Sequence, residues 1–187
     1  GGRAGIVVPD GFLFGTDGAK LAIKRRVLTE FNLHTIIRMP GSVFAPYTSI
    51  ATNILFFDNE RAEDAPEGYA TKETWFYRLD MPEGYKHFSK TKPMLIDHCK
   101  PMVEWWNNRV EIIDNETGDE KSRCFSAQEL LDLGLNFDQC KFPKEEEEVL
   151  RPEELLKQYH EKRTALDAKI DQTLSEIQQM LGIKIDE

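Results

Sequence analysis

Apolar residues in the first 80 positions occur in short runs separated by polar, Pro-bearing or Gly-bearing stretches. Short runs rich in Val, Ile, Phe and Tyr are typical of buried β-strands. Four such runs predict strands at residues 4–8, 35–38, 50–57 and 73–79. The first run is followed by Pro9-Asp10-Gly11, residues that are typical of a turn, so we expect a buried strand that ends in a turn there.

Between the first two runs the spacing of apolar residues changes to that of a helix. Apolar side chains recur every four positions at Ile23, Val27 and Phe31, with Leu28 beside them. The pattern predicts an amphipathic helix over residues 19–31 whose charged side chains point away from the sheet. These charged residues are Lys24, Arg25 and Glu30.

The order of these elements predicts a topology. A strand, a helix and a strand within about 40 residues form a crossover, which predicts a parallel pair covered by the helix. The strand at residues 50–57 follows after a loop alone, so it should run antiparallel to the strand before it. Residues 1–80 therefore resemble one edge of an α/β sheet.

The following segment is more irregular. Residues 59–71 and 80–93 have loop composition, and Pro101 predicts a kinked or late-starting helix within residues 94–106. Residues 109–125 predict a hairpin that turns at 114–118, and Ser126 to Glu129 fit a capping box that opens a short helix ending at Gly134. Trp105 and Trp106 are interpreted as core or interface residues.

The C-terminal segment predicts a single long helix. The run KEEEE at residues 144–148 has the composition of a solvated linker, and helix-favouring residues continue from Pro152 to Leu181 before a C-capping Gly182. Positions at alternating spacings of three and four form a heptad seam with two polar interruptions, Arg163 and Thr173. Its apolar members are Leu156, Tyr159, Leu166, Ile170, Ile177 and Met180. At 1.5 Å per residue the rod is roughly 45 Å long, which favours a partner helix over packing back on its own body.

Composition excludes several classes of protein. The 187 residues are 40% hydrophobic and 30% charged, without a membrane span or a signal segment, so we expect a cytoplasmic protein that does not enter a membrane. Three cysteines without CxxC spacing argue against disulfides and zinc, and His98-Cys99 alone makes no metal site. The chain starts without Met inside a strand, which we interpret as a fragment whose missing part lies on the N-terminal side.

Charge is unevenly distributed. The net charge is -9, yet residues 1–57 hold six Lys and Arg against three Asp and Glu. A mildly basic first third is a weak indication that this part of the chain binds a polyanion.

These stretches together resemble a specific family. GGRAGIVVPDGFLFG, a helix, NLHTIIRMPGSVFAPYTSIATNILFFD and ETWFYRL look like the C-terminal half of the modification (M) subunit of bacterial type I restriction-modification systems. KTKP at residues 90–93 and SRCFSAQEL at 122–130 extend the resemblance. Such subunits are adenine-N6 DNA methyltransferases.

The resemblance implies a partial S-adenosylmethionine-dependent, Rossmann-like sheet. Residues 4–8, 35–38 and 50–57 would be its fifth, sixth and antiparallel seventh strands. Residues 1–80 would then be the C-terminal half of the methyltransferase domain, 81–143 an α+β extension, and 144–187 an acidic linker with a partner-binding helix. Implied partners are the DNA-specificity subunit, the restriction subunit and double-stranded DNA.

The resemblance also places part of a target-base pocket here. An adenine leaves the duplex before its amine is methylated, and an aromatic face replaces its lost stacking. A Val-Phe pair in the loop before the last strand supplies such a face in related enzymes, which maps to Val43 and Phe44, with Tyr47 as a weaker candidate. Asn53 is interpreted as ordering the strand.

Two family features are missing. The chain contains no Asn-Pro, so the catalytic Asn-Pro-Pro-Phe stretch is not present, and GTDGAK at residues 15–20 is no cofactor-binding Gly-rich turn. We therefore expect no catalytic residues and no S-adenosylmethionine binding in this chain, although the parent enzyme would use that cofactor.

Two other functions remain open from the sequence. One is a non-catalytic module that docks a specificity subunit through its C-terminal helix, or that associates with its own copies. The other is an unrelated α/β enzyme with its active site among His34, Asp10 and Asp17, although no nucleophile and base occur there in a recognisable frame.

Overall fold

The computed structural model describes residues 1–114, 118–139 and 152–181. The chain divides into two units, residues 1–144 and 145–187. Three sequence predictions lie wholly or partly outside the described residues: the centre (115–117) of the hairpin turn predicted at 114–118, the linker at 144–148 and the cap at Gly182.

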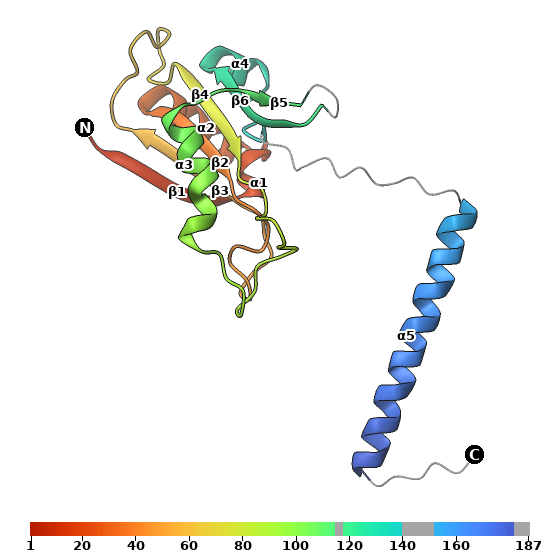
Figure 1. The fold of residues 1–187 in the computed structure, drawn as a ribbon. Coiled ribbons are helices and arrows are strands. Elements are labelled where there is room, and N and C mark those ends of the chain that lie inside the picture. The colour runs from red at the N-terminus through yellow and green to blue at the C-terminus, as the bar shows by residue number, and fades with distance from the viewer. Residues whose placement is uncertain (115–117, 140–151, 182–187) are drawn as a thin grey trace. The chain divides into compact units, whose positions relative to one another are not determined.

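The described part of the first unit contains one six-stranded sheet with helices on both faces (Figure 1). Its strands are β1 (Arg3–Pro9), β2 (Asn32–Arg38), β3 (Thr52–Asp58), β4 (Glu73–Arg78), β5 (Ile112–Ile113) and β6 (Glu120–Ser126). Its helices are α1 (Asp10–Leu13), α2 (Gly18–Glu30), the 3-10 turn η1 (Ile96–Cys99), α3 (Lys100–Asn107) and α4 (Ala127–Asp132).

The strand order is β1-β3-β2-β4-β6-β5. β3 runs antiparallel to β2, as expected for strands joined by a loop, and it also runs antiparallel to β1. β1 and β2 therefore point the same way, but the prediction that they pair is wrong because β3 lies between them. β2 instead pairs in parallel with β4.

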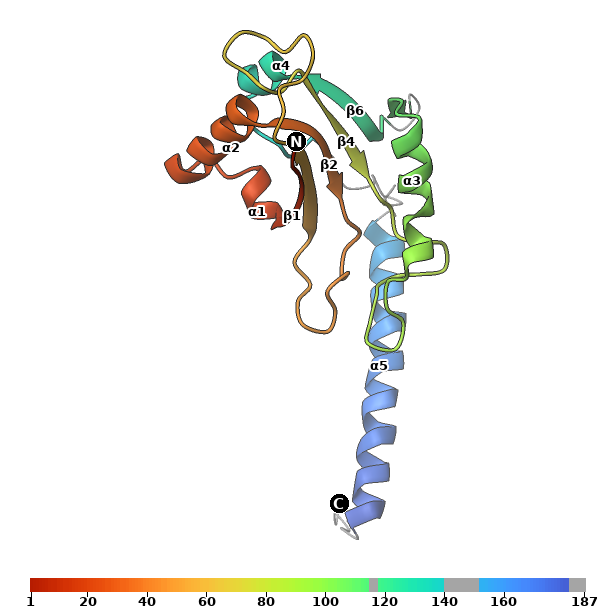
Figure 2. The ribbon, with the colours of Figure 1, turned by 90° about the vertical axis from the view of Figure 1, so that its left-hand side faces the viewer.

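The sheet is covered differently on its two faces (Figure 2). α1 and α2 lie on one face and α3 on the other. The core beneath the first face consists of Leu13, Leu28, Leu33, Ile36, Leu55, Phe76, Leu130, Leu135 and Phe137. The core on the α3 face consists of Ile37, Met39, Tyr77, Leu79 and Trp105. Central strand residues on both faces are thus buried, which explains the continuous apolar runs of β2 and β4.

Helix α2 forms where expected but turns a different face to the sheet. Lys24 and Leu28 are fully buried, whereas Ile23 is 51% exposed. The prediction that Lys24 points away from the sheet is therefore wrong. Burial of its ammonium group is possible because backbone carbonyl groups surround it, as described below.

Strand β1 is present, but the prediction that it is buried is wrong. Ile6 is 48% exposed and Val7 is 52% exposed. Within the described sheet β1 has a strand on one side alone, so its outer edge and much of its faces remain accessible.

Several local signals are confirmed. α3 starts late, after η1, with Pro101 in its first turn, and Trp105 is buried in the core. β5 and β6 form the predicted hairpin. The capping box of Ser126 and Glu129 opens α4, and Gly134 has the positive φ of 65° that ends such a helix.

The second unit contains the predicted long helix α5 (Pro152–Leu181), which has 30 residues. The six apolar residues of the predicted seam, and Leu174 beside them, are all exposed, by 45% to 86%. Within its own unit, α5 therefore presents an uncovered apolar seam.

Candidate functional site

The loop predicted to hold the base pocket joins the carboxyl end of β2 to the start of β3, at residues 39–51. Its two ends are held together because the Met39 amide donates to the Thr52 carbonyl at 3.0 Å. Inside the loop, the amides of Tyr47 and Thr48 both donate to the carbonyl of Phe44, at 2.9 and 3.3 Å. The segment is therefore a compact series of turns that contains the cis peptide Ala45-Pro46.

The three predicted pocket residues lie close in sequence but point into different surroundings. Val43 is half-buried and packs against the α3-side core. Phe44 is 43% exposed and Tyr47 is 93% exposed. Val43 thus anchors the loop, while the rings of Phe44 and Tyr47 remain accessible to a ligand.

A second loop, residues 79–95 between β4 and η1, lies beside the first at the same end of the sheet (Figures 1 and 2). The Phe88 amide donates to Ser42 Oγ at 2.8 Å, and the Phe88 ring is buried against His98 with centroids 5.8 Å apart. Ser42 has a φ of 60°, in the left-handed region. No sequence pattern connects these loops, although a single Phe in the polar stretch 86–93 is a signal that could suggest an anchor.

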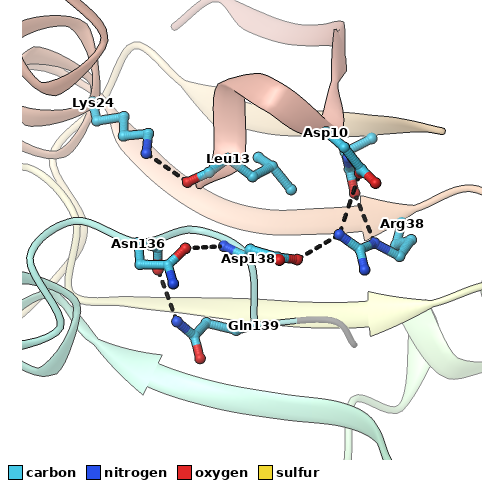
Figure 3. Close-up of polar contacts among 8 residues, drawn as sticks. Asp10, Leu13, Lys24, Arg38, Asn136, Asp138 and Gln139 are labelled. Atoms are coloured by element: carbon cyan, nitrogen blue, oxygen red, sulfur yellow. Dashed lines mark hydrogen bonds and ion pairs between the residues drawn. The ribbon is translucent and has the colours of Figure 1, made fainter. Parts of the chain in front are cut away.

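A buried ionic network lies at the stem of the first loop (Figure 3). Arg38, the last residue of β2, is 2% exposed, and its Nη2 donates to Asp10 Oδ1 at 3.2 Å and to Asp138 Oδ1. Asn53 is fully buried and its Nδ2 donates to the same Asp10 oxygen. Sequence reasoning missed this network, although an Arg at the end of the apolar run IIR is an unusual residue for a buried strand.

Lys24 forms a second buried polar centre (Figure 3). Its Nζ donates to the carbonyl oxygens of Leu13, at 2.5 Å, and of Gly15 and Leu135, both at 3.0 Å. Burial is the main cause that lowers the pKa of Lys24, and the nearby Lys20 lowers it further. The lysine joins α1, α2 and the segment after α4, so its role is to hold the fold.

The alternative active site is not assembled. Asp10 belongs to the Arg38 network, Asp17 caps α2 by accepting from the Lys20 amide, and His34 bonds Thr35 Oγ1 at 2.8 Å. His34 borders an open hollow of about 550 Å³, but no Ser, Thr, Cys or Lys is among the residues that line it. This hollow therefore offers no hydroxyl, thiol or amine for His34 to activate as a base.

GTDGAK at residues 15–20, the turn considered for cofactor binding, offers no open cradle for S-adenosylmethionine. The candidate glycine turn before α2 is filled by the chain itself: a Cβ on Gly15 would lie 2.3 Å from Lys20 Cδ and 2.8 Å from the Gly11 carbonyl oxygen. Among the described residues, no group of His, Cys, Asp and Glu could hold a metal ion, and no helix is long and apolar enough to cross a membrane.

Comparison with known proteins identifies the family. Residues 1–148 match the family described as N-6 DNA Methylase. The chain belongs to the N-6 DNA methylase family. The resemblance drawn from the sequence motifs is thereby confirmed.

Curated N-6 DNA methylase relatives are subunits of type I restriction enzymes. The chain is 37% identical to the EcoEI methylase subunit of Escherichia coli, covering 97% of this chain and 34% of that protein. It is 33% identical to the EcoKI methylase subunit of E. coli K12, covering 69% of this chain and 23% of that protein. The chain thus spans about a third or less of the length of these relatives.

Similar solved structures also come from type I restriction-modification systems. A modification subunit of a putative type I restriction enzyme from Vibrio vulnificus YJ016 is 43% identical, with a TM-score of 0.55 over 69% of this chain and 23% of that one. A chain from a structural study of complex assembly and conformational transition of the type I R-M system is 33% identical, with a TM-score of 0.59 over 95% of this chain and 36% of that one. The mixed α/β architecture is therefore that of N-6 DNA methylase modification subunits.

Proposed function

We propose that this chain is the target-base side of a site-specific DNA adenine-N6 methyltransferase, the modification subunit of a type I restriction-modification system. The observation that carries the proposal is the loop of residues 39–51. It presents the accessible rings of Phe44 and Tyr47 where β2 ends and β3 begins. Loops at strand ends are the usual carriers of binding residues on such scaffolds.

The chemistry of the reaction explains why an aromatic loop is useful there. An adenine in a duplex has to leave the base stack before its exocyclic amine is accessible, at a cost of a few kcal/mol. Stacking on an aromatic side chain returns about 1 to 3 kcal/mol per base. Phe44 is the proposed stacking ring, Val43 holds the loop against the core, and Tyr47 contributes a second face.

The strand arrangement supports a partial Rossmann-like methyltransferase sheet. In this proposal β1, β2 and β3 are the fifth, sixth and seventh strands, and the antiparallel seventh is inserted between the other two. Residues 1–80 contribute this part, 81–143 are an extension of the sheet, and 144–187 are a linker and a docking helix. The complete protein would work in the cytoplasm on double-stranded DNA.

Cofactor binding and catalysis belong, in this proposal, to the parts of the parent protein that this chain does not span. The GTDGAK turn offers no open cradle for S-adenosylmethionine and the sequence contains no Asn-Pro-Pro-Phe stretch, so the chain alone should neither bind the cofactor nor methylate DNA. Isothermal titration of the purified chain with S-adenosylmethionine tests this point. Binding with a micromolar dissociation constant would contradict it.

The second proposed function is docking of a DNA-specificity subunit by α5, within a complex that also holds the restriction subunit. The uncovered apolar seam of α5 favours it, since such a seam is stable in water when it packs against another helix. One structural relative comes from work on complex assembly of the type I R-M system, which supports the same proposal.

A chimaera tests the methyltransferase proposal. This chain replaces the matching third of the EcoEI methylase subunit, to which it is 37% identical. With the remaining subunits of that system, the chimaera should methylate adenine in the cognate site. A chimaera that folds and binds cofactor but leaves the cognate adenine unmethylated would contradict the proposal.

A further inference from the structure

The strongest unassigned feature is the network that closes the stem of the 39–51 loop. Arg38 and Asn53 are cross-strand partners in the register of β2 and β3, and they lie directly before the loop and two positions after its last residue. Arg38 Nε lies 3.5 Å from Asn53 Oδ1, a long contact, so this pair alone holds the stem weakly.

Asp10 supplies a further restraint from a third element, beside the backbone bond between Met39 and Thr52. One of its carboxylate oxygens accepts from both Arg38 Nη2 and Asn53 Nδ2. Its own amide donates to the carbonyl of Ala51 at 3.1 Å, on the last residue of the loop. Asp10 therefore contacts both sides of the stem through its side chain and the end of the loop through its backbone.

Charge and burial make these contacts strong. Arg38 and Asn53 are almost fully buried and Asp10 is largely buried, with 18% of its side chain exposed. Hydrogen bonds between ionised groups are about twice as strong as neutral ones, and a buried guanidinium needs such partners. Asp138 is the second carboxylate on Arg38 (Figure 3), and it brings the segment after α4 to the same guanidinium.

We propose that Asp10 is a positioning residue which, through Arg38 and Asn53, fixes the stem of the 39–51 loop and so sets where Phe44 stands. The link to Phe44 as a base-contacting ring rests on the proposed function. The restraint on the loop is independent of the proposed function. Asp10 itself touches neither the base nor the cofactor in this scheme.

Hydrogen exchange of the whole chain tests the restraint without any activity. The reporters are the loop amides of Ala45, Tyr47 and Thr48, and amides within β2 and β4 report the core. In Asp10→Ala the loop amides should exchange about tenfold faster or more, relative to the core amides. Asp10→Asn keeps an acceptor oxygen and should restore part of the protection.

Asp17→Ala is the matched control, because Asp17 also stabilises the fold from its side chain but caps α2 away from the stem. It should raise loop and core exchange equally or not at all. If Asp10→Ala and Asp10→Asn leave the ratio of loop to core exchange at its wild-type value, the proposal is wrong. Should Asp10→Ala not fold, Asp10→Asn alone decides by the same ratio.

The same variants in the EcoEI chimaera separate this inference from the proposed function. Asp10→Ala should lower kcat and the fluorescence of 2-aminopurine at the target position, with the Kd for S-adenosylmethionine unchanged, and Asp10→Asn should rescue part of both losses. Faster loop exchange with wild-type methylation would leave the positioning role standing and contradict the base pocket. Unchanged loop exchange contradicts the positioning role whatever the methylation rate.

Discussion

The ammonium group of Lys24 donates to the carbonyl oxygen of Leu135, 111 positions further along the chain, at 3.0 Å. This bond joins α2 to the last described segment of the first unit. It also shows how a residue that sequence patterning assigns to a solvated face can become part of the core.

Replacement of Lys24 should therefore destabilise the first unit. Lys24→Met removes the ammonium donor from three carbonyl oxygens, of which that of Leu13 still accepts from the Phe137 amide, and an unsatisfied buried acceptor costs about 1 to 3 kcal/mol. Urea unfolding should show a lower free energy of unfolding by about that amount. Arg25→Met, at an exposed position of the same helix, should change it by less than about 0.5 kcal/mol. Equal effects of the two substitutions would contradict the structural role of Lys24.

His34 should make stability depend on pH. Burial lowers its pKa below the ordinary value of 6.5, the charges of Arg109 and Arg3 lower it further, and Asp58 partly opposes them. Below pH 6.5 the unfolded chain binds a proton that the folded chain binds less readily, so the free energy of unfolding falls as the pH falls.

Urea unfolding of the wild type and of His34→Gln between pH 8 and pH 5 measures this effect. The comparison isolates His34, because both proteins contain all the other titrating groups. The variant should lose less stability over this interval than the wild type. The two curves running parallel would show that His34 does not titrate differently in the folded state.

Phe44 should matter for base extrusion in the complete enzyme. Phe44→Ala removes stacking of about 1 to 3 kcal/mol, which corresponds to a loss of about 5-fold to 150-fold in the extruded population. The readouts, in the EcoEI chimaera, are the methylation rate and the fluorescence of 2-aminopurine at the target adenine. Affinity for cofactor should barely change.

Phe14→Ala is the control for this prediction, since Phe14 is 55% exposed but ends α1 rather than lying in the loop. It should keep wild-type rates. Full 2-aminopurine enhancement and wild-type methylation in Phe44→Ala would mean that the ring merely caps the sheet end.

The isolated chain should self-associate. The seam of α5 is uncovered within its unit and β1 has an open edge, both of which favour contacts between copies. Multi-angle light scattering at tens of micromolar should give a mass above that of the monomer. Ile170→Glu, on the seam, should lower it, whereas Ser175→Glu, on the opposite side of the helix, should not. A strictly monomeric wild type would rule this out.

Sequence reasoning succeeded where the determinants are local. The capping box of Ser126 and Glu129, the late start of α3 at Pro101 and the length of α5 all depend on neighbouring residues. The family also followed from a combination of short stretches such as RMPGSVF and ETWFYRL, which are read directly from neighbouring residues.

It failed where the partner is distant. Asp138 reaches Arg38 across 100 positions, and no spacing rule connects a carboxylate after α4 to a guanidinium at the end of β2. The burial of β1 was misjudged for a similar reason: its composition indicates a core strand, but exposure depends on which strands flank it. The candidate loop was located by its motif. The contacts of Asp10 with Arg38 and Asn53 at its stem could not be predicted, because they join segments that are distant in the sequence.

The insertion of β3 between β1 and β2 also fixes an order of assembly. β1 is first in the chain, but within the described sheet its backbone pairs with β3 alone, whose residues come more than forty positions later. During synthesis β1 has to wait until β3 emerges, while α2 and β2 are already available for local structure. Of these three strands, β1 is therefore synthesised first and docks last, and the β2–β3 hairpin is the template on which it does so.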